Sequence, residues 1–206
     1  MSITLYGFSG STYVRTVRML LAEKGADYRQ VPVDVIQGEP HHPEHLLRHP
    51  FGKVPVIEHE GFKVIETGAI THYLNEVLPG PSLLPDTAQG RARANMAIGI
   101  YDAYGYNALV AVAGYHLFPD FIGGRNEAAR EAGIEKGRQV LRELMKIRGR
   151  DRFIAGPNAS LADFYLVPFC SYISQTPDAA RLFDIEGFAQ WWEQVQALPS
   201  FQATQP

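Results

Sequence analysis

Two short stretches of this chain have the residue types that hold a peptide-like ligand. In the first, a Val54-Pro55 pair opens a strand-like run that ends at Ile57. Proline lacks a backbone donor and is tolerated at the start of a strand, so the amide and carbonyl of Val54 are free to pair with a group outside the sheet. In the second, a Glu66-Thr67 pair stands where another strand gives way to a helix, with Thr67 as the expected N-cap of that helix. The amides of a helix N-terminus bind carboxylates, so the two stretches together predict a site for a peptide-like ligand.

A third stretch places hydroxyl groups between the first strand and the first helix. Ser11 comes just before a helical pattern, with Ser9 and Thr12 beside it. Serine is a preferred N-cap, so a structural cap is the simplest interpretation of any of the three. A hydroxyl beside a helix N-terminus also stabilises an anion such as a thiolate. Tyr6 at the end of the strand is a rival hydroxyl, although strand tyrosines usually serve packing.

The elements that must position these residues follow the order β-α-β-loop-β-β-α. The predicted strands and helices are strands at 3–8, 31–35, 54–57 and 62–65, and helices at 14–24 and 67–78. Pro32 falls inside the second strand, which predicts that this strand lies at a sheet edge. A strand-helix-strand unit implies a parallel pair, and the hairpin adds an antiparallel pair. The order therefore predicts a thioredoxin-like domain with a mixed sheet, β-α-β-β-β-α.

The second part of the chain is predicted to be entirely helical. A Pro-Gly-Pro run that begins at Pro79 ends the preceding helix. The predicted boundaries are a first domain at 1–79, a linker at 80–86 and an all-helical domain at 87–206. Asp86 is the expected cap of a long helix, and Ser160 and Asp163 have the spacing of a capping box. The predicted fold class is therefore α/β plus all-α.

Composition limits the classes of function. The chain has 206 residues, of which 46% are hydrophobic and 20% charged, with a net charge of −3. These values are typical of a globular protein and give no electrostatic reason to expect nucleic acid or an anionic membrane as a partner. The single cysteine, Cys170, excludes an intrachain disulfide and a CxxC redox pair. No apolar stretch approaches the length of a membrane span and no leader is recognisable, so we expect a cytoplasmic protein.

The run 49–57, His-Pro-Phe-Gly-Lys-Val-Pro-Val-Ile, closed by 62–67, Phe-Lys-Val-Ile-Glu-Thr, resembles the glutathione-binding segment of the cytosolic glutathione transferases. The resemblance is closest to their serine-type, phi-like branch. It covers residues 3–201, motif by motif in the first third and later mainly through 153–168, which is similar to the capped helix of the family's helical domain. It implies a two-domain, dimeric enzyme that conjugates glutathione, its co-substrate, to small hydrophobic electrophiles, with no metal.

The resemblance also implies roles for single residues. Ser11 would donate its hydroxyl to the sulfur of glutathione, although Thr16 stands where the family usually has a basic residue. The implied glutathione-binding residues are His41, Lys53, Val54, Pro55, Glu66 and Thr67. Among these, Glu66 and Thr67 correspond to the positions that hold the γ-glutamyl end. His41 and Lys53 correspond to those that grip the glycyl carboxylate. Relatives often carry lysine at the first of these, and histidine is only partly charged at pH 7, so this end is expected to bind less tightly.

The electrophile pocket and the dimer contact are implied less specifically. The pocket candidates are Phe8, Ser9, Tyr104, Tyr106, His116 and Phe118. An aromatic series on a long helix is more often core or dimer contact than a pocket lining, and that alternative stays open. Phe51 aligns with the aromatic key that some transferases insert into the partner subunit. An exposed phenylalanine requires burial, which a homodimer would supply.

A histidine-rich stretch before the glutathione-binding run allows a metal site as an alternative. The residues concerned are His41, His42, Glu44 and His45. Pro43 interrupts the cluster, and nothing in the spacing defines a tetrahedral set of ligands. We therefore favour a solvated loop and predict no metal.

Two other functions remain possible on the same fold. One is an enzyme that mainly reduces disulfides or peroxides with glutathione, and the other is a binding or regulatory module without catalysis. The presence of Ser11, Val54-Pro55 and Glu66-Thr67 argues against the second, because a module that has lost its chemistry often loses such residues. Fold alone does not separate these alternatives.

Overall fold

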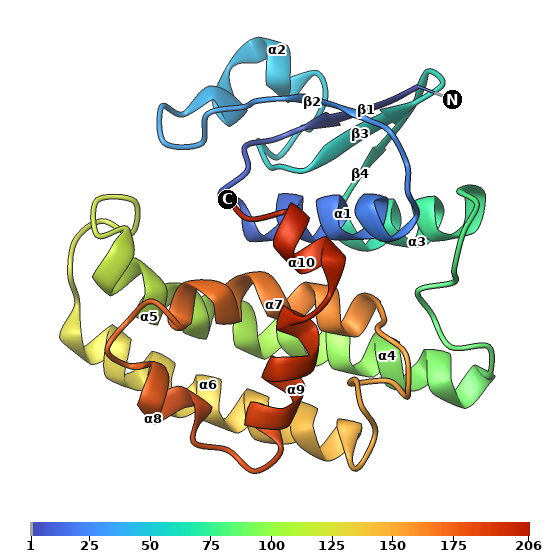
Figure 1. The fold of residues 1–206 in the computed structure, drawn as a ribbon. Coiled ribbons are helices and arrows are strands. Elements are labelled where there is room, and N and C mark those ends of the chain that lie inside the picture. Colours follow the sequence, from blue (N-terminus) through green and yellow to red (C-terminus); the bar gives the residue numbers. More distant parts are fainter. Residues whose placement is uncertain (1) are drawn as a thin grey trace. The chain divides into compact units, whose positions relative to one another are not determined.

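The computed structural model describes residues 2–206, which divide into two units. The first unit contains the chain up to Leu83 together with Leu198–Pro206, and the second contains Leu84–Ala197. The predicted helical domain extended to residue 206, whereas the structure places the C-terminal segment with the first unit. Figure 1 follows the chain through both units from blue to red.

A mixed four-stranded sheet in the order β2-β1-β3-β4 forms the centre of the first unit. The strands are β1 (Ile3–Tyr6), β2 (Arg29–Val31), β3 (Val56–His59) and β4 (Phe62–Ile65). β1 pairs in parallel with β2 and antiparallel with β3, which pairs antiparallel with β4 across a turn at Glu60 and Gly61. The predicted thioredoxin-like topology is therefore confirmed.

The edge strand β2 ends earlier than the alternating valines predicted. It covers Arg29–Val31, so the predicted strand at 31–35 is wrong in its bounds. Pro32 follows the last residue of the strand instead of interrupting it. Because proline has no N–H to donate, the ladder stops there. The strand does lie at the edge of the sheet, as Pro32 predicted.

Two helices cover one face of this sheet, α1 (Thr12–Glu23) and α3 (Thr67–Val77) (Figure 1). Their apolar faces meet the sheet in a core whose fully buried members include Leu5, Val17, Leu20, Ile57, Ile70 and Leu74. On the other side, the connection from β2 to β3 contains a 3-10 turn, Glu39–His41, and a short helix, α2 (Pro43–Leu46). The site residues predicted between 41 and 55 therefore belong to this connection.

The C-terminal helix α10 (Pro199–Ala203) packs on α1 within the first unit. The guanidinium of Arg15, a buried residue of α1, donates to the carbonyl of Phe201 at 3.2 Å and lies 4.7 Å from the centre of its ring. Arg18 donates to the carbonyl of Thr204 at 3.2 Å. These bonds explain why the end of the chain groups with the first unit, which residue spacing alone does not reveal.

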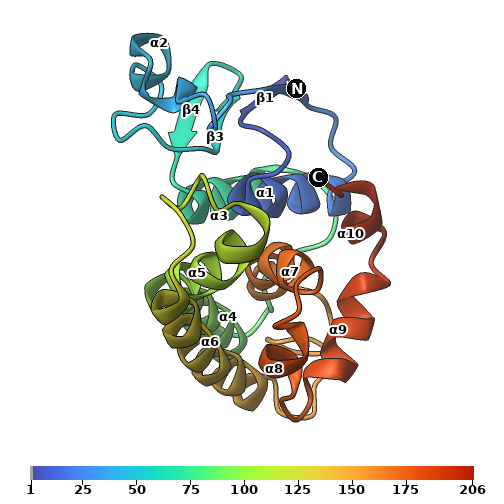
Figure 2. The same ribbon diagram turned by 90° about the vertical axis from the view of Figure 1, so that its left-hand side faces the viewer.

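The second unit is a bundle of helices around α7, whose residues are buried except Tyr172 (Figure 2). Its helices are α4 (Ala88–Ile100), α5 (Tyr106–Leu117), α6 (Glu127–Arg148), α7 (Leu161–Ile173), α8 (Ala179–Phe183) and α9 (Phe188–Gln196). A π-helical segment, Tyr101–Gly105, joins α4 to α5. The cap of α4 is Thr87, whose hydroxyl accepts the N–H of Gly90 at 3.0 Å, so the predicted cap at Asp86 is wrong by one residue.

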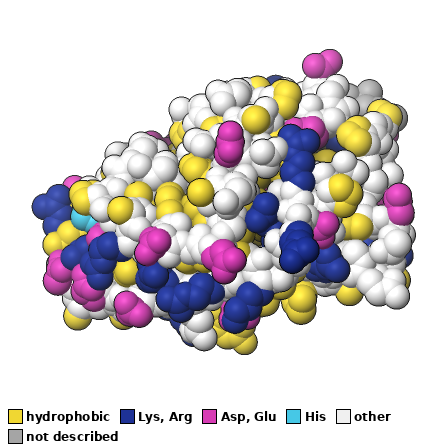
Figure 3. Space-filling view, turned by 60° about the horizontal axis from the view of Figure 1, so that its bottom comes forward, with side chains coloured by type: hydrophobic (Ala, Val, Ile, Leu, Met, Phe, Trp, Pro, Cys, Tyr) yellow, Lys and Arg dark blue, Asp and Glu magenta, His cyan; other side chains and the backbone are white. Residues whose placement is uncertain are grey.

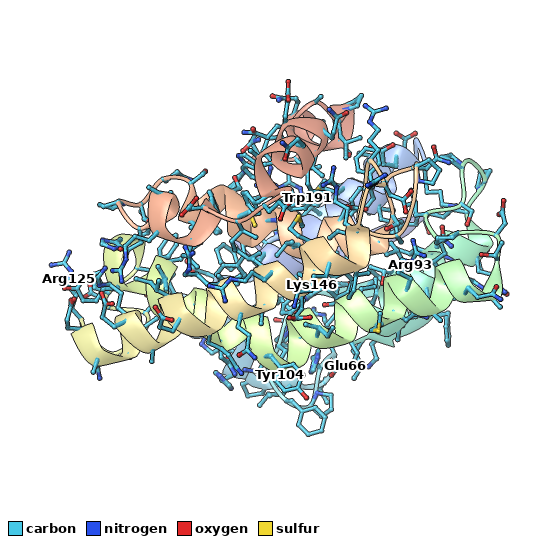
Figure 4. The ribbon with its side chains drawn as sticks, turned by 90° about the horizontal axis from the view of Figure 1, so that it is seen from below. Glu66, Arg93, Tyr104, Arg125, Lys146 and Trp191 are labelled. Carbon is cyan, nitrogen blue, oxygen red and sulfur yellow. The ribbon has the colours of Figure 1, made fainter. Side chains whose placement is uncertain are left out.

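The carboxylate of Asp163 joins three parts of the helical unit. It is fully buried, and it accepts hydrogen bonds from the N–H of Ile154 at 3.0 Å, from the N–H and hydroxyl of Ser160 at 2.9 and 3.0 Å, and from the indole of Trp191 at 2.8 Å. Trp191, labelled in Figure 4, comes from α9 and lies inside the unit. The predicted capping box is present. Burial raises the pKa of Asp163, while its hydrogen bonds act in the opposite direction.

The surface shown in Figure 3 carries no large area of one charge sign. Basic and acidic side chains are interspersed across this face. Among residues 2–206, no helix combines the length and the apolar composition that crossing a bilayer requires.

We expect the Asp163 carboxylate to contribute more stability than the Ser160 cap. Ser160→Ala removes one hydroxyl and should lower the free energy of unfolding by about 1 kcal/mol. Asp163→Ala leaves the Trp191 indole and two backbone amides buried without an acceptor, at a cost of about 1–3 kcal/mol for each unsatisfied group. Urea unfolding measures both variants, with Asp120→Ala on an exposed loop as the control. A cost for Asp163→Ala no larger than that for Ser160→Ala would contradict this assignment.

Candidate functional site

Ser11 is the N-cap of α1, at the end of the loop that follows β1. Its Oγ accepts the N–H of Val14 at 3.4 Å, and its backbone is extended, with φ −73° and ψ 128°. The structural interpretation of Ser11 as a cap is therefore correct. A hydroxyl has one hydrogen to donate and two lone pairs to accept with, and capping uses a lone pair. The cap and the donation of a hydrogen bond to a sulfur are thus compatible functions of the same residue.

The rival hydroxyls lie close by in the same unit. Tyr6 is the last residue of β1, and the guanidinium of Arg48 lies 4.6 Å from the centre of its ring. Ser9 accepts a bond from the side-chain amide of Gln30 at 3.4 Å. Phe8, half-buried, belongs to the turn in which its carbonyl accepts the N–H of Ser11 at 3.1 Å. The loop after β1 thus brings together three residues predicted for the site, Phe8, Ser9 and Ser11.

Val54 and Pro55 lie just before β3, and the peptide bond between them is cis. The ladder between β1 and β3 ends where Tyr6 faces Val56. Val54 therefore lies beyond the end of this ladder, as the position of Pro55 predicted, and its amide and carbonyl are not used in pairing with β1.

Gly7 lets the Val54 segment approach the loop that carries Ser11. A Cβ atom on Gly7 would lie 2.4 Å from Cγ2 of Val14 and 3.4 Å from Cβ of Val54. Any larger residue would displace one of these neighbours. The signal in the sequence is the glycine at the end of the first strand, a position that usually marks such a close approach.

The start of α3 presents backbone amides without a side-chain cap. Glu66 is the residue that precedes the helix, and its side chain makes no capping hydrogen bond. Thr67 is the first residue of the helix, so its prediction as the N-cap is wrong by one position. Glu66 has φ 69° and ψ 121°, a strained conformation for a residue with a side chain. Because first-turn amides have no partner inside a helix, this end is suited to an anion.

His41 packs against the loop 50–53, of which Lys53 is the last residue. Both residues are exposed, and the carbonyl of Lys53 accepts a hydrogen bond from Nε2 of His45 at 2.8 Å. The ring of His41 packs against Gly52, where a Cβ atom would lie 2.6 Å from Nδ1 of His41. Gly52 also has φ +58°, a conformation that other residues avoid. The glycine therefore allows His41 to lie next to the residue before Lys53.

The predicted pocket residues on α5 and its π-helical start have their own partners inside the helical unit. Tyr104, labelled in Figure 4, is 58% exposed, and the ammonium of Lys136 lies 5.5 Å from its ring centre. Tyr106 packs edge-on against Phe169 with ring centres 5.3 Å apart. Phe118, the residue after α5, packs edge-on against Tyr172 at 5.2 Å.

His116 belongs to a charged network in the helical unit. Its Nε2 lies 2.8 Å from Oδ2 of Asp178, and Nη1 of Arg130 lies 2.6 Å from the same oxygen. Burial tends to raise the pKa of Asp178, but the hydrogen bonds from Arg130 and His116 outweigh it and hold the pKa below its usual range. Sequence reasoning missed Asp178 and Arg130, because the three residues are far apart in the chain and share no spacing.

The histidine-rich connection does not assemble a metal site. Within the described chain, 2–206, no group of three or more histidine, cysteine, aspartate or glutamate side chains is arranged to hold a metal ion. His45 instead bonds to the carbonyl of Lys53, and Glu44 pairs with Arg48 at 2.6 Å on α2 and its C-terminal end.

Comparison with known proteins agrees with this geometry. The model of the family "Glutathione S-transferase, N-terminal domain" matches residues 1–76. Glutathione S-transferase F10 of Arabidopsis thaliana is 28% identical over 98% of this chain and 95% of its own. Residues 1–76 thus match the N-terminal domain of the glutathione transferases, and the chain is similar to members of this family along nearly its whole length. Plant F-type, or phi-class, members are among its relatives.

Solved structures of glutathione transferases match both units. Glutathione transferase F7 from Populus trichocarpa superposes with a TM-score of 0.88 at 26% identity, covering 98% of this chain and 97% of that one. A structure of glutathione S-transferase-I bound with lactoylglutathione has a TM-score of 0.84 at 27% identity, with the same two coverages. The chain therefore shares the fold of the glutathione transferases along nearly its whole length.

The close contact at Gly52 makes a prediction about stability. Gly52→Ala should lower the free energy of unfolding by about 1–2 kcal/mol, the cost of a left-handed conformation for a residue with a Cβ, and it should also displace the ring of His41. Urea unfolding measures the change. The control is Gly99→Ala on α4, where a Cβ meets nothing within 4 Å and alanine should stabilise the helix by up to about 1 kcal/mol. Equal effects at the two glycines would refute the argument.

Proposed function

We propose that this protein conjugates the thiol of glutathione to small hydrophobic electrophiles, with Ser11 as the catalytic hydroxyl. The observation that supports the proposal is the arrangement around Gly7 in the first unit. The first turn of α1, which Ser11 caps, and Val54, whose backbone is not used in the β1–β3 ladder, both approach this glycine. The uncapped start of α3 belongs to the same unit. The family match across residues 1–76 covers all three features.

The backbone and charges of this unit suit the three parts of glutathione. The amide and carbonyl of Val54, held next to Pro55, pair with the cysteinyl residue. The first turn of α3 at Thr67 binds the γ-glutamyl carboxylate, and the carboxylate of Glu66 receives the ammonium. His41 and Lys53 bind the glycyl carboxylate.

The hydroxyl of Ser11 acts by stabilising the thiolate. A free thiol has a pKa of about 8.5, so only a few per cent is ionised at pH 7. A hydrogen bond to a charged group contributes about 1.5–3 kcal/mol, or about one to two pKa units. Lowering the pKa by two units raises the thiolate fraction at pH 7 about 25-fold. The less basic thiolate is, however, about 8-fold less nucleophilic. Activation thus supplies a few-fold, and positioning of the thiolate against the electrophile supplies the remainder.

The state of the one cysteine argues against disulfide exchange through a thiolate of the protein itself. Cys170 is buried in α7, and burial raises the pKa of its thiol well above the usual range. The chain therefore offers no thiolate of its own for exchange with a disulfide. In this proposal glutathione is the nucleophile and no metal takes part. The proposal also includes a cytoplasmic location and a detoxifying role.

A homodimer through Phe51 is part of the proposal. The side chain of Phe51 is 71% exposed on the loop before Val54, and Leu47 and Phe62 of the same unit are 80% and 57% exposed. Large apolar side chains that gather on one unit mark interaction surfaces. A second copy of the chain would bury Phe51.

Ser11→Ala tests the catalytic role. We expect the pKa of the bound glutathione thiol to rise by about one to two units and turnover to fall, with glutathione affinity little changed because the backbone contacts remain. The pH–rate profile with an aryl chloride and the ultraviolet absorbance of the bound thiolate measure the change. Tyr6→Phe and Ser9→Ala test in the same way whether either rival hydroxyl contacts the sulfur instead. An unshifted profile in Ser11→Ala would remove its role, and no calorimetric binding of glutathione to the wild type would favour a non-catalytic module.

Phe51→Ser tests the dimer. We expect the wild type to sediment as a dimer and the variant to shift toward the monomer, because the interface loses a large apolar anchor. Analytical ultracentrifugation over a range of concentrations measures the association. The exposed Phe121 in the second unit supplies the control, Phe121→Ser. A wild type that is monomeric at all concentrations would contradict the proposed assembly.

A further inference from the structure

We propose that His49 is a positioning residue that orients the Glu66 carboxylate for the ammonium group of glutathione. The inference rests on the proposed function and deepens it, because it assigns a role to a residue that does not itself touch glutathione. His49 is 2% exposed, and its Nε2 lies 3.6 Å from Oε1 of Glu66. The buried ring therefore approaches the side chain that precedes α3.

The second nitrogen of His49 is already used inside the loop. Nδ1 accepts the N–H of Phe51 at 3.3 Å, and the two rings meet edge-on with centres 6.2 Å apart. The backbone of His49 is held as well, because its N–H donates to the carbonyl of His45 and its carbonyl accepts from Gly52, at 2.8 and 2.9 Å. The buried ring, held at Nδ1, therefore has little freedom to turn.

The bond from Phe51 determines the tautomer of His49. A backbone amide only donates, so Nδ1 must be unprotonated, and in a neutral imidazole the proton is then on Nε2. The Nε2–H group is then the donor that lies 3.6 Å from the carboxylate of Glu66. The neutral ring thus provides a donor in a fixed position without a buried charge.

The contact between His49 and Glu66 serves to orient the carboxylate of Glu66 and contributes little to the stability of the fold. The side chain of Glu66 is 68% exposed, and exposed ion pairs contribute little to folding. A glutamate side chain on the surface samples several rotamers, and each must be lost when a ligand binds. The fixed Nε2–H group of His49 beside one carboxylate oxygen of Glu66 reduces this loss of conformational entropy. The other oxygen is left for the ammonium group of glutathione. The strained backbone of Glu66, with φ 69°, sets the direction in which its side chain leaves the start of α3.

The charged and titratable groups around His49 explain its neutral state. Burial lowers the pKa of His49, Glu66 acts to raise it, and His45 and Lys53 lower it further. At pH 7 the ring is therefore neutral. Protonation in acid would place an N–H on Nδ1 opposite the N–H of Phe51. It would also put a positive charge next to Glu66, where it competes with the ammonium of glutathione.

Two substitutions separate the nitrogens of His49. In His49→Asn, the amide oxygen replaces Nδ1 and keeps the bond from Phe51, but no donor reaches Glu66. In His49→Gln, the longer amide replaces Nε2 and keeps the donor. The ligands are glutathione and an analogue whose γ-glutamyl group lacks the α-amino group. His42→Gln, on an exposed histidine in the same connection, is the matched control.

We expect calorimetry to show about three- to fivefold weaker binding of glutathione by His49→Asn, the size of an exposed ionic contact. Binding of the analogue should be unchanged, and His49→Gln should bind both ligands like the wild type. Turnover at saturating glutathione should be unchanged in both variants. Because the pKa of His49 is lowered, the preference of the wild type for glutathione over the analogue should be constant near pH 7 and fall only as the pH drops below about 6.5, the ordinary pKa of histidine. It should stay constant in His49→Gln.

Several outcomes would overturn the inference. Equal weakening of glutathione and of the analogue in His49→Asn would mean a general structural role, and no weakening would mean no role. If His49→Asn does not fold, the pH comparison of the wild type with His49→Gln decides, and identical pH dependence refutes the proposal. A wild type that binds neither ligand would instead remove the proposed function, on which this inference depends.

Discussion

The proposed glutathione site depends on whether the backbone N–H groups at the start of a helix have a hydrogen-bond partner. The first N–H groups of any helix have no partner within it. At α1 the hydroxyl of Ser11 satisfies one of them, whereas Glu66 at the start of α3 caps none with its side chain. The two helices therefore present different ends to a ligand. The N-terminus of α1 carries a hydroxyl with a hydrogen to donate, and the N-terminus of α3 carries amides without a side-chain cap, which are suited to a carboxylate.

The connection between β2 and β3 is held by buried histidines instead of an apolar core. Nε2 of His45 bonds to the carbonyl of Lys53, and Nδ1 of His49 accepts the amide of Phe51. Both bonds join a side chain to the backbone of the same loop, so they fix its path without relying on the side chains that the loop exposes. Lys53 and Phe51 are therefore left free for a ligand and for a second copy of the chain.

The helical unit obtains its organisation from a different kind of interaction. The carboxylate of Asp163 accepts bonds from the preceding loop, from the start of α7 and from Trp191 of α9. A buried carboxylate is costly unless such donors surround it, so these bonds fix the relative positions of the segments that supply them. The network of His116, Arg130 and Asp178 joins α5, α6 and the segment before α8 in a similar way.

The order of elements and the main binding segments were determined by local sequence. Alternating apolar residues, the Pro55 signal and the Ser160 capping box depend on neighbouring residues, and the sheet topology, the free backbone at Val54 and the start of α7 follow from them. Small errors arose at the ends of elements, such as the limits of β2 and the caps of α3 and α4. The competing candidates there are adjacent residues with similar propensities, and backbone geometry decides among them.

Contacts between distant residues were decided only by the tertiary structure. The packing of α10 on α1 through Arg15, the approach of Val54 to Gly7, and the ion pair of His116 with Asp178 join segments with no common spacing in the chain. The contact between His49 and Glu66 is of the same kind, since it needs the loop and the start of α3 to meet. A sequence lists residue types and short-range periods, whereas the identity of a side chain's partner depends on how the whole chain packs.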